Sequence, residues 1–313
     1  MNTTLNSILF SILITVTPIF YAYYKKEKAT YLITSMWGVI SFIITILLLT
    51  VIKLDYNLVI VFITTLISTL FNICFIKEWV VPKKLLKLLL VFSLFFFSSL
   101  FQLIPIWIFD LNIKKLTSSQ EVYLTLFSDS IILVILFFLY RKEIKEQFTK
   151  FKKKFYEYSD TAFKYWLIGL IVMVISNLLI TAFSPNSVAS NEQQVQQLIS
   201  GAPWISLICV GILAPIIEEF TFRKAFYDAF NKNWLFIVIS GLVFGSLHVV
   251  LSLESLWDLL YLIPYSSLGI AFGFVMCKTK NVFPSILVHI FHNTCLTLLS
   301  IVGESSAMVM MLW

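Results

Sequence analysis

The feature that most constrains this chain is a succession of long apolar runs separated by short polar segments. Each run has roughly the 20 residues that a helix needs to cross the hydrocarbon core of a bilayer. The runs lack the period-two alternation of transmembrane barrel strands, and only 13% of the residues are charged. The sequence therefore predicts an all-α fold, a polytopic integral membrane helical bundle of about ten transmembrane helices. The expected spans are 5–24, 30–52, 57–76, 88–109, 121–140, 163–183, 202–222, 234–251, 258–277 and 282–302.

The basic residues lie in short segments between these runs. A net charge of +6 alone could suggest a nucleic-acid partner, but this placement is typical of membrane orientation. With the amino terminus outside, 20 of the 23 Lys and Arg residues fall on the cytoplasmic side, and only Lys53, Lys114 and Lys115 do not. We therefore expect both termini outside, contact with the lipid bilayer, and no nucleic-acid partner.

The longest basic segment, at 141–155, divides the chain into two parts. We predict a transmembrane region of open role at 1–158, a second domain at 159–303 and a tail at 304–313. The first apolar run has no signal-peptide flanks, so we expect it to be retained. The Gln-rich part of 184–200 is expected to form a short helix. All four cysteines lie in apolar runs without metal-ligand spacing, which predicts small buried side chains.

Two adjacent carboxylates stand at the end of an apolar run, in Pro215–Phe230. Charged side chains in a membrane helix are costly and usually functional. Glu219 and Arg223 are four residues apart, so they share one helix face and can pair. Glu218 points about 100° away and lacks that partner. One carboxylate is thus held and one is free, a pattern expected of acid/base sites; the alternative is a charge cluster in water at the helix end.

All three histidines follow the long basic segment. His248 lies in an apolar run with Phe244 on its face, where Gly241 and Gly245 permit close helix approach. In the last run, His289 and Asn293 share a face, and both can donate hydrogen bonds to an oxyanion. The alternative for each is a polar contact between helices. Because His248 lies near the outer end of its expected span, it reaches Glu218 only if the helices are offset or tilted.

These residues resemble the motifs of a known family. The order Glu218-Glu219-xxx-Arg223, Phe244-xxx-His248 and His289-xxx-Asn293 is similar to that of the CPBP (CAAX protease and bacteriocin-processing, or Abi) intramembrane proteases, which include the Rce1-type endopeptidases. The resemblance covers about residues 160–302, and no motif position departs from it.

The resemblance implies a role for each matching residue. Glu218 would be the general base that activates a water, assisted by His248. His289 and Asn293 would stabilise the oxyanion, and Arg223 would hold Glu219 and the helix end. These residue types suit such a step. A metal alternative uses the same side chains: Glu218, His248 and His289 would form a His₂Glu set, as in catalytic zinc sites. The sequence leaves both open, and the glutamate-water mechanism needs no ion.

The leading interpretation is an intramembrane endopeptidase acting on a peptide or protein presented at the membrane. The Phe-, Ile-, Lys- and Asn-rich composition is typical of a low-GC bacterium, hence of a bacterial cell membrane. It favours leader-peptide or bacteriocin processing, or immunity, over prenylated substrates. A second hypothesis is a catalytically silent scaffold that binds a partner such as a cell-wall enzyme through the N-terminal spans. A third is a proton-coupled transporter, since Glu and His also form proton relays.

Overall fold

The computed structural model describes residues 3, 7–16, 31–51, 56–77, 82–183, 190–230, 233–250 and 256–303. The predicted tail at 304–313 lies outside these residues. The described residues form helices and no strand, which confirms the all-α prediction. By its contacts the chain divides into two compact units, residues 1–85 with 250–252, and residues 86–249 with 253–313.

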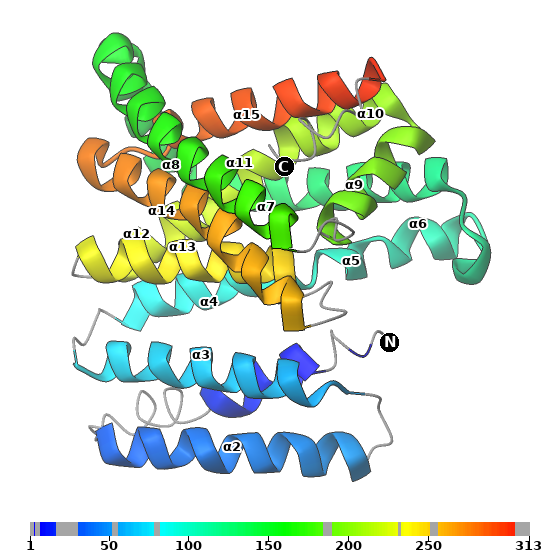
Figure 1. Cartoon of the computed structure of the whole chain (residues 1–313), viewed down its shortest axis with the longest axis vertical. Coiled ribbons are helices and arrows are strands. Elements are labelled where there is room, and N and C mark those ends of the chain that lie inside the picture. Colours follow the sequence, from blue (N-terminus) through cyan, green and yellow to red (C-terminus); the bar gives the residue numbers. More distant parts are fainter. Residues whose placement is uncertain are drawn as a thin grey trace. The chain divides into compact units, whose positions relative to one another are not determined.

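The first unit is built from three described helices: Ser7–Val16, α2 (Tyr31–Val51) and α3 (Leu58–Lys77) (Figure 1). Polar side chains join these otherwise apolar helices. The Thr15 hydroxyl lies 3.1 Å from that of Ser41, and the Asn72 amide donates to the carbonyl of Thr15 at 2.6 Å. Such contacts are the usual links between helices in lipid, where burial of apolar surface gives no preference for a neighbouring helix.

The second unit contains the remaining helices, and α4 (Pro82–Phe96) crosses into it. The first part of this unit comprises α5 (Ser98–Phe101), α6 (Leu103–Ile108), η1 (Ile113–Lys115), α7 (Ser118–Lys153), α8 (Phe155–Phe183) and α9 (Ser190–Gly201). A discontinuous helix then runs through α10 (Pro203–Ile208), η2 (Cys209–Leu213), α11 (Ala214–Glu218), η3 (Glu219–Ala225) and α12 (Phe226–Ala229). The last elements are α13 (Asn233–Val250), η4 (Leu256–Tyr261), α14 (Leu262–Thr279) and α15 (Phe283–Ile301).

The helix ends of this unit follow from local chemistry. At the start of α7, Thr117 accepts a hydrogen bond from the Gln120 amide while the Gln120 side chain accepts one from Thr117, which is a capping box. At the start of α15, the Asn281 side chain accepts from the Phe283 amide at 3.0 Å and donates to the Gln147 carbonyl of α7 at 2.7 Å. The segment that carries His289 is therefore anchored to α7.

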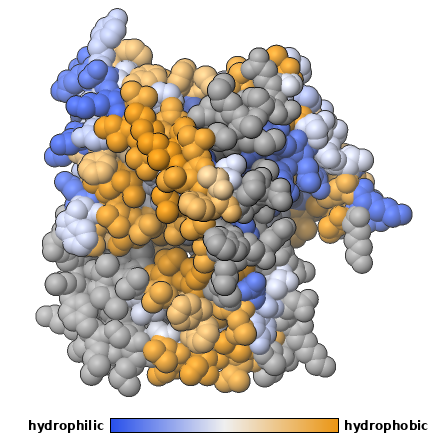
Figure 2. Space-filling view, viewed as in Figure 1, coloured by the Kyte–Doolittle hydropathy of each residue, from blue (hydrophilic) through white to orange (hydrophobic). Residues whose placement is uncertain are grey.

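The surface of the second unit has the polarity of a membrane protein. Large apolar side chains of α8 are exposed, among them Ile171, Ile175 and Leu179, whereas the charged pair Glu219 and Arg223 is fully buried. Figure 2 shows a broad band of hydrophobic side chains on the face in view, with hydrophilic residues gathered toward its edges. Hydrogen bonds within the helices satisfy the polar groups of the backbone, and the exposed apolar side chains can face lipid.

The expected number of ten spans is not confirmed. Among the described residues, five helices are long and apolar enough to cross a membrane: Ser118–Lys153, Phe155–Phe183, Pro203–Ala229, Asp258–Thr279 and Phe283–Ile301. A sixth arises if Lys87–Phe96 and Ser98–Ile108, bent by 60°, count as one span. Other expected spans coincide with shorter apolar helices: Ser7–Val16, Trp37–Leu49, Ile60–Thr69 and Asn233–Val249.

Three local expectations can be compared with the structure. The basic segment at 141–155, expected to lie between two spans, is largely helical, because α7 continues to Lys153. The Gln-rich segment forms α9, which agrees with the expected short helix. Of the cysteines in the described part of the chain, Cys209 is buried, while Cys277 and Cys295 are half-buried.

Candidate active site

The helix that carries the glutamate pair does not end at Arg223. The expected boundary of 202–222 was wrong, because the helical path runs on to Ala229. Glu219 and Arg223 have no exposed surface, so the interpretation of the pair as a helix end in water is also wrong. The longer helix places Glu218 well inside the span. Glu218 and His248 can therefore lie at a similar depth, which the shorter expected span did not allow without offset or tilted helices.

Pro215 interrupts the hydrogen-bond ladder of this helix. A proline has no N–H, so it cannot donate to the carbonyl four residues earlier, that of Gly211. The Thr294 hydroxyl of α15 donates to the Gly211 carbonyl at 3.1 Å, and the Asn293 amide donates to Val210 at 3.2 Å. The wider π-helical segment η2 thus presents two carbonyls to α15. Short π-helical segments often occur at functional sites.

A chain of three charged or polar side chains lies behind the site. The Arg223 guanidinium pairs with Glu219 at 3.3 Å, as their spacing predicts, and Nδ1 of His289 lies 3.0 Å from the same Glu219 oxygen. A carboxylate can only accept, so Nδ1 of His289 carries a proton and donates it. This bond fixes the ring orientation, in the way that carboxylates orient the histidines of metal sites.

Aromatic rings take the place of water around Arg223. Its guanidinium lies 4.6 Å from the ring centroid of Phe244 and 5.5 Å from that of Phe272. Cation–π contact of this kind stabilises a desolvated guanidinium by about 2 kcal/mol. The contact with Arg223 therefore gives Phe244 a structural role in the motif Phe244-xxx-His248, one helical turn before His248.

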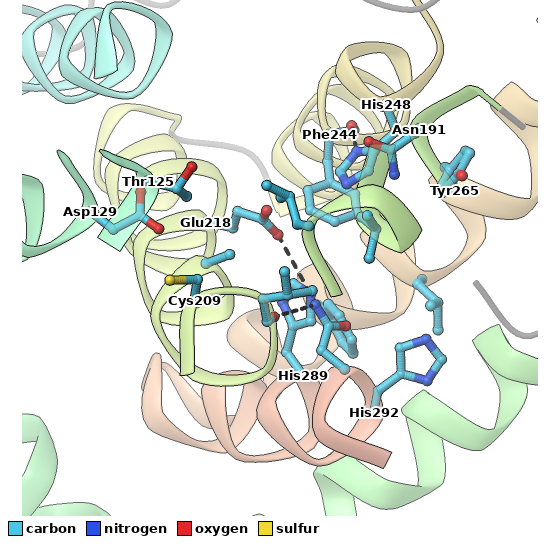
Figure 3. A pocket seen from close by; sticks show the side chains of 17 residues that line it. Thr125, Asp129, Asn191, Cys209, Glu218, Phe244, His248, Tyr265, His289 and His292 are labelled. Carbon is cyan, nitrogen blue, oxygen red and sulfur yellow. Dashed lines mark hydrogen bonds and ion pairs between the residues drawn. The ribbon is translucent and has the colours of Figure 1, made fainter. Parts of the chain in front are cut away.

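Glu218 occupies a different position from its neighbour. Its side chain keeps 13% of its surface exposed, whereas Glu219 keeps none. Its Oε2 lies 3.5 Å from Nε2 of His289 (Figure 3), whereas Glu219 contacts Nδ1 of the same ring. The two carboxylates thus divide into a buried orienting group and an accessible group, as the sequence predicts.

His248 reaches the same place from α13. Its Nδ1 lies 2.9 Å from the carbonyl of Phe244. Because a carbonyl only accepts, Nδ1 is the protonated nitrogen, and Nε2 of the neutral ring is an acceptor. Such a nitrogen can hold or deprotonate a water. The ring also stacks on Tyr265 of α14, with centroids 5.0 Å apart.

Close packing of α13 on α14 makes this placement possible. A Cβ added to Gly241 would lie 2.8 Å from the backbone nitrogen of Ile270, and one added to Gly245 would lie 2.7 Å from that of Ser266. Larger residues would hold the two helices apart. The expected close approach at these glycines is confirmed.

A cavity of about 260 Å³ collects the predicted residues. Figure 3 shows their side chains converging on it from several helices of the second unit. Four predicted residues line it directly, namely Glu218, His248, His289 and Asn293. Glu219 and Arg223 support it from behind. The other lining residues are Thr125, Asp129, Asn191, Val195, Leu198, Cys209, Val210, Ala214, Phe244, Tyr265, Leu268, Phe272 and His292.

Asp129 is the main residue that the motif reasoning missed. It lies on α7, before the region of resemblance, and shares its helix face with Thr125. The sequence could have identified it, because Asp129 is the only charged residue between Glu121 and Arg141. An acid within an apolar span is a functional candidate. Near the cavity but outside the spans, burial raises the pKa of Glu192 to about 7, beside the lining residue Asn191.

The fit of a metal ion can be tested on the same side chains. Among the described residues, no three His, Cys, Asp or Glu side chains gather closely enough to hold an ion. His289 also faces a carboxylate on each side, Glu219 at Nδ1 and Glu218 near Nε2. As arranged, these residues do not fit a His₂Glu zinc site. The zinc alternative stays a prediction.

The arrangement brings together the parts that peptide hydrolysis requires. An accessible carboxylate and an imidazole acceptor can activate a water. An oriented histidine and an amide side chain stand beside them and can donate to an oxyanion. The enclosing apolar walls strengthen each of these electrostatic contacts.

Comparison with known proteins finds membrane peptidases among the proteins similar to this chain. Residues 200–295 match the family described as Type II CAAX prenyl endopeptidase Rce1-like. The chain is 29% identical to the putative membrane peptidase YdiL of Bacillus subtilis over 116 residues, 36% of this chain and 44% of that relative. It is 24% identical to the membrane-embedded CAAX protease MroQ of Staphylococcus aureus over 136 residues, 41% of this chain and 51% of that relative.

A further relative is the UPF0177 protein YbdI of Lactococcus lactis, 29% identical over 145 residues, 44% of this chain and 76% of that protein. No solved structure is significantly similar to the chain. The site and fold define a polytopic membrane protein with a buried Glu/His centre. The matches support the resemblance: over residues 200–295 the chain is similar to the Rce1-like endopeptidases.

Proposed function

We propose that this protein is an intramembrane endopeptidase that hydrolyses a peptide bond of a membrane-presented peptide or protein. The observation that carries the proposal is the convergence of Glu218, His248, His289 and Asn293 on one cavity from three different helices, α11, α13 and α15. Polar contacts between helices would explain each residue alone. They would not require an accessible carboxylate beside two histidines.

The chemical step follows from the positions of these groups. Glu218 accepts a proton from a water that His248 Nε2 helps to hold, while the water oxygen bonds to the peptide carbonyl carbon. The carbonyl π electrons move to oxygen, and the resulting oxyanion accepts hydrogen bonds from Asn293 and from His289 Nε2 when that ring carries both protons. The intermediate then collapses: the C–N bond breaks, the amine nitrogen takes the proton from Glu218, and a carboxylic acid remains.

We propose a leader-peptide or bacteriocin-related substrate in a bacterial cell membrane, because the composition is that of a low-GC bacterium. Two named relatives, from Bacillus and Staphylococcus, are called a membrane peptidase and a CAAX protease, respectively.

Replacing Glu218 by Gln tests the proposal, because it removes the proton acceptor but keeps the side-chain shape. Wild-type and Glu218→Gln proteins in lipid vesicles would be given membrane-anchored leader peptides, and the products followed by mass spectrometry. We expect cleavage to fall about 100- to 10,000-fold, the usual contribution of a general base. Glu146→Gln on the exposed part of α7 is the matched control and should cleave like wild type.

The same assay separates the competing hypotheses. Cleavage by Glu218→Gln at the wild-type rate would contradict the protease mechanism and favour the silent scaffold. Uptake that follows a pH gradient across the vesicles would favour the transporter. Loss of cleavage on treatment with a chelator, with recovery on adding zinc, would favour the metal alternative over the glutamate-water mechanism.

A further inference from the structure

Asp129 is a second carboxylate that faces the cavity of Glu218. It is the only charged residue in the stretch 122–140 of α7, and it lies one helical turn after Thr125. Both residues line the cavity, with Glu218 and Cys209 on the neighbouring helix (Figure 3). The carboxylate therefore comes from a helix outside the family match at 200–295.

The charges around the cavity do not balance. Asp129 and Glu218 both line it, and no Lys or Arg occurs among the lining residues in the described part of the chain. The buried arginine behind the site, Arg223, is paired with Glu219. The end of the cavity formed by α7 and α11 thus carries two carboxyl groups and no basic side chain, in a low-dielectric surrounding where electrostatic contacts are strong.

Asp129 itself has no hydrogen bond or ion pair with any other residue that the structure describes. The hydroxyl of Thr125 donates its proton to the Glu121 carbonyl at 2.9 Å, which leaves the hydroxyl oxygen as an acceptor. A carboxylate inside a membrane helix is costly without a partner, and carboxylates that persist there commonly serve substrates or ions. Two acceptors side by side, the carboxylate and the hydroxyl, suit a group that only donates.

We propose that Asp129 and Thr125 form a subsite for a cationic group of the substrate, a Lys or Arg side chain or a terminal ammonium close to the scissile bond. This inference rests on the proposed function, because the subsite shares its cavity with Glu218. A donor-rich cation supplies the charge that the cavity lacks. The cavity is also small, so it suits a short extended segment rather than a folded partner.

Matched peptides test this assignment. Starting from one cleaved leader peptide, each residue flanking the scissile bond would be replaced in turn by Lys or by norleucine, which keeps the length of the chain but not the charge. We expect wild type to prefer Lys at one position by about tenfold or more in kcat/KM, the effect of a hydrogen bond to a charged group.

Asp129→Asn should abolish this preference, so that the Lys and norleucine peptides are cleaved with equal kcat/KM. Asp129→Lys should move the preference to Glu at the same position. Asp160→Asn, an exposed change on α8, is the control and should keep the preference for Lys. An unchanged preference in Asp129→Asn would overturn the subsite, and so would an equal loss of cleavage on both peptides.

A binding measurement separates this inference from the proposed activity. In the Glu218→Gln background, which keeps Asp129 but removes the base, the Lys peptide should bind about tenfold more tightly than the norleucine peptide. Adding Asp129→Asn should remove that difference. If wild type cleaves nothing yet this difference is seen, the subsite stands and the protease proposal fails. Equal binding of both peptides would overturn the subsite.

Discussion

At the scale of single residues, charged side chains of the site are buried and apolar side chains are exposed, the opposite of the usual distribution in soluble proteins. Arg223 and Glu219 are fully buried, while apolar side chains of α8 face outward. Three nitrogens of Arg223 lack a hydrogen bond within the described residues, so its charge depends on Glu219 and on the two phenylalanine rings. A charge that depends on so few contacts makes the stability of the site sensitive to single substitutions.

Removing one partner of this ion pair should cost more than removing both. Arg223→Met leaves the Glu219 carboxylate buried without its cation, and we expect a loss of about 3–5 kcal/mol in the free energy of unfolding. The double variant Glu219→Gln with Arg223→Met buries no unpaired charge, so it should recover most of that loss. Unfolding in detergent micelles, compared over wild type, both single variants and the double variant, measures the coupling.

An exposed pair provides the control for this cycle. Lys150 and Glu146 are also four residues apart, but each keeps more than half of its side chain exposed. The same cycle there should give a coupling of only about 0.3–0.5 kcal/mol. A double variant at 219 and 223 that is no more stable than Arg223→Met would contradict the proposed dependence.

Much of the site could be predicted from residue spacing, and the reasons for the misses are physical. The offsets of four residues correctly paired Glu219 with Arg223. The boundary at 222 was wrong because the free energy of an arginine in lipid depends on partners distant in sequence, here Phe244 and Phe272, which spacing alone does not reveal. Asp129 was missed because no neighbour in the sequence shows that α7 lies opposite Glu218.

At the scale of elements, a proline and a pair of glycines determine where the reactive groups lie. Pro215 leaves the Gly211 carbonyl to Thr294 and so ties η2 to α15. Gly241 and Gly245 bring α13 against α14, and with it His248. The glycine contact was expected from the sequence. The π-helical segments were not, because their hydrogen bonds depend on which helix packs against the proline.

A side chain at Gly241 should therefore move His248 away from Glu218. The new Cβ of Gly241→Ala would meet backbone atoms of α14 that cannot move without shifting the helix, and overpacking of this kind costs about 1–3 kcal/mol. We expect lower thermal stability together with a fall in cleavage of at least about tenfold. Both quantities can be measured on the same vesicle preparation.

Gly273 on α14 is the matched control, because it faces the same helix pair. A Cβ there would lie 3.3 Å from Cα of Ile237, a contact that needs only a small adjustment. Gly273→Ala should change stability and cleavage little. Equal effects of the two substitutions would show that the close approach at Gly241 does not position His248.

At the scale of the whole molecule, every described lining residue of the cavity belongs to the second unit. The first unit adds none of them, so the proposed chemistry does not by itself explain residues 1–85. A partner protein bound through these helices remains the proposal for them. The predicted domain limit at 158/159 is likewise a prediction, and Asp129 shows that residues before this limit contribute to the cavity.

Membrane orientation is the remaining prediction at this scale, since the basic residues place the 141–155 segment inside and α9 outside. After replacement of the four native cysteines, a single cysteine would be introduced at exposed Lys152 or at exposed Gln194. In intact cells a membrane-impermeant thiol reagent should label Gln194→Cys and not Lys152→Cys, whereas both should react after the cells are broken. Between these positions the described part of the chain has one candidate span, α8, so labelling of both or of neither in intact cells would mean that α8 does not cross the bilayer. Labelling of Lys152→Cys alone would reverse the predicted orientation and place the basic 141–155 segment outside.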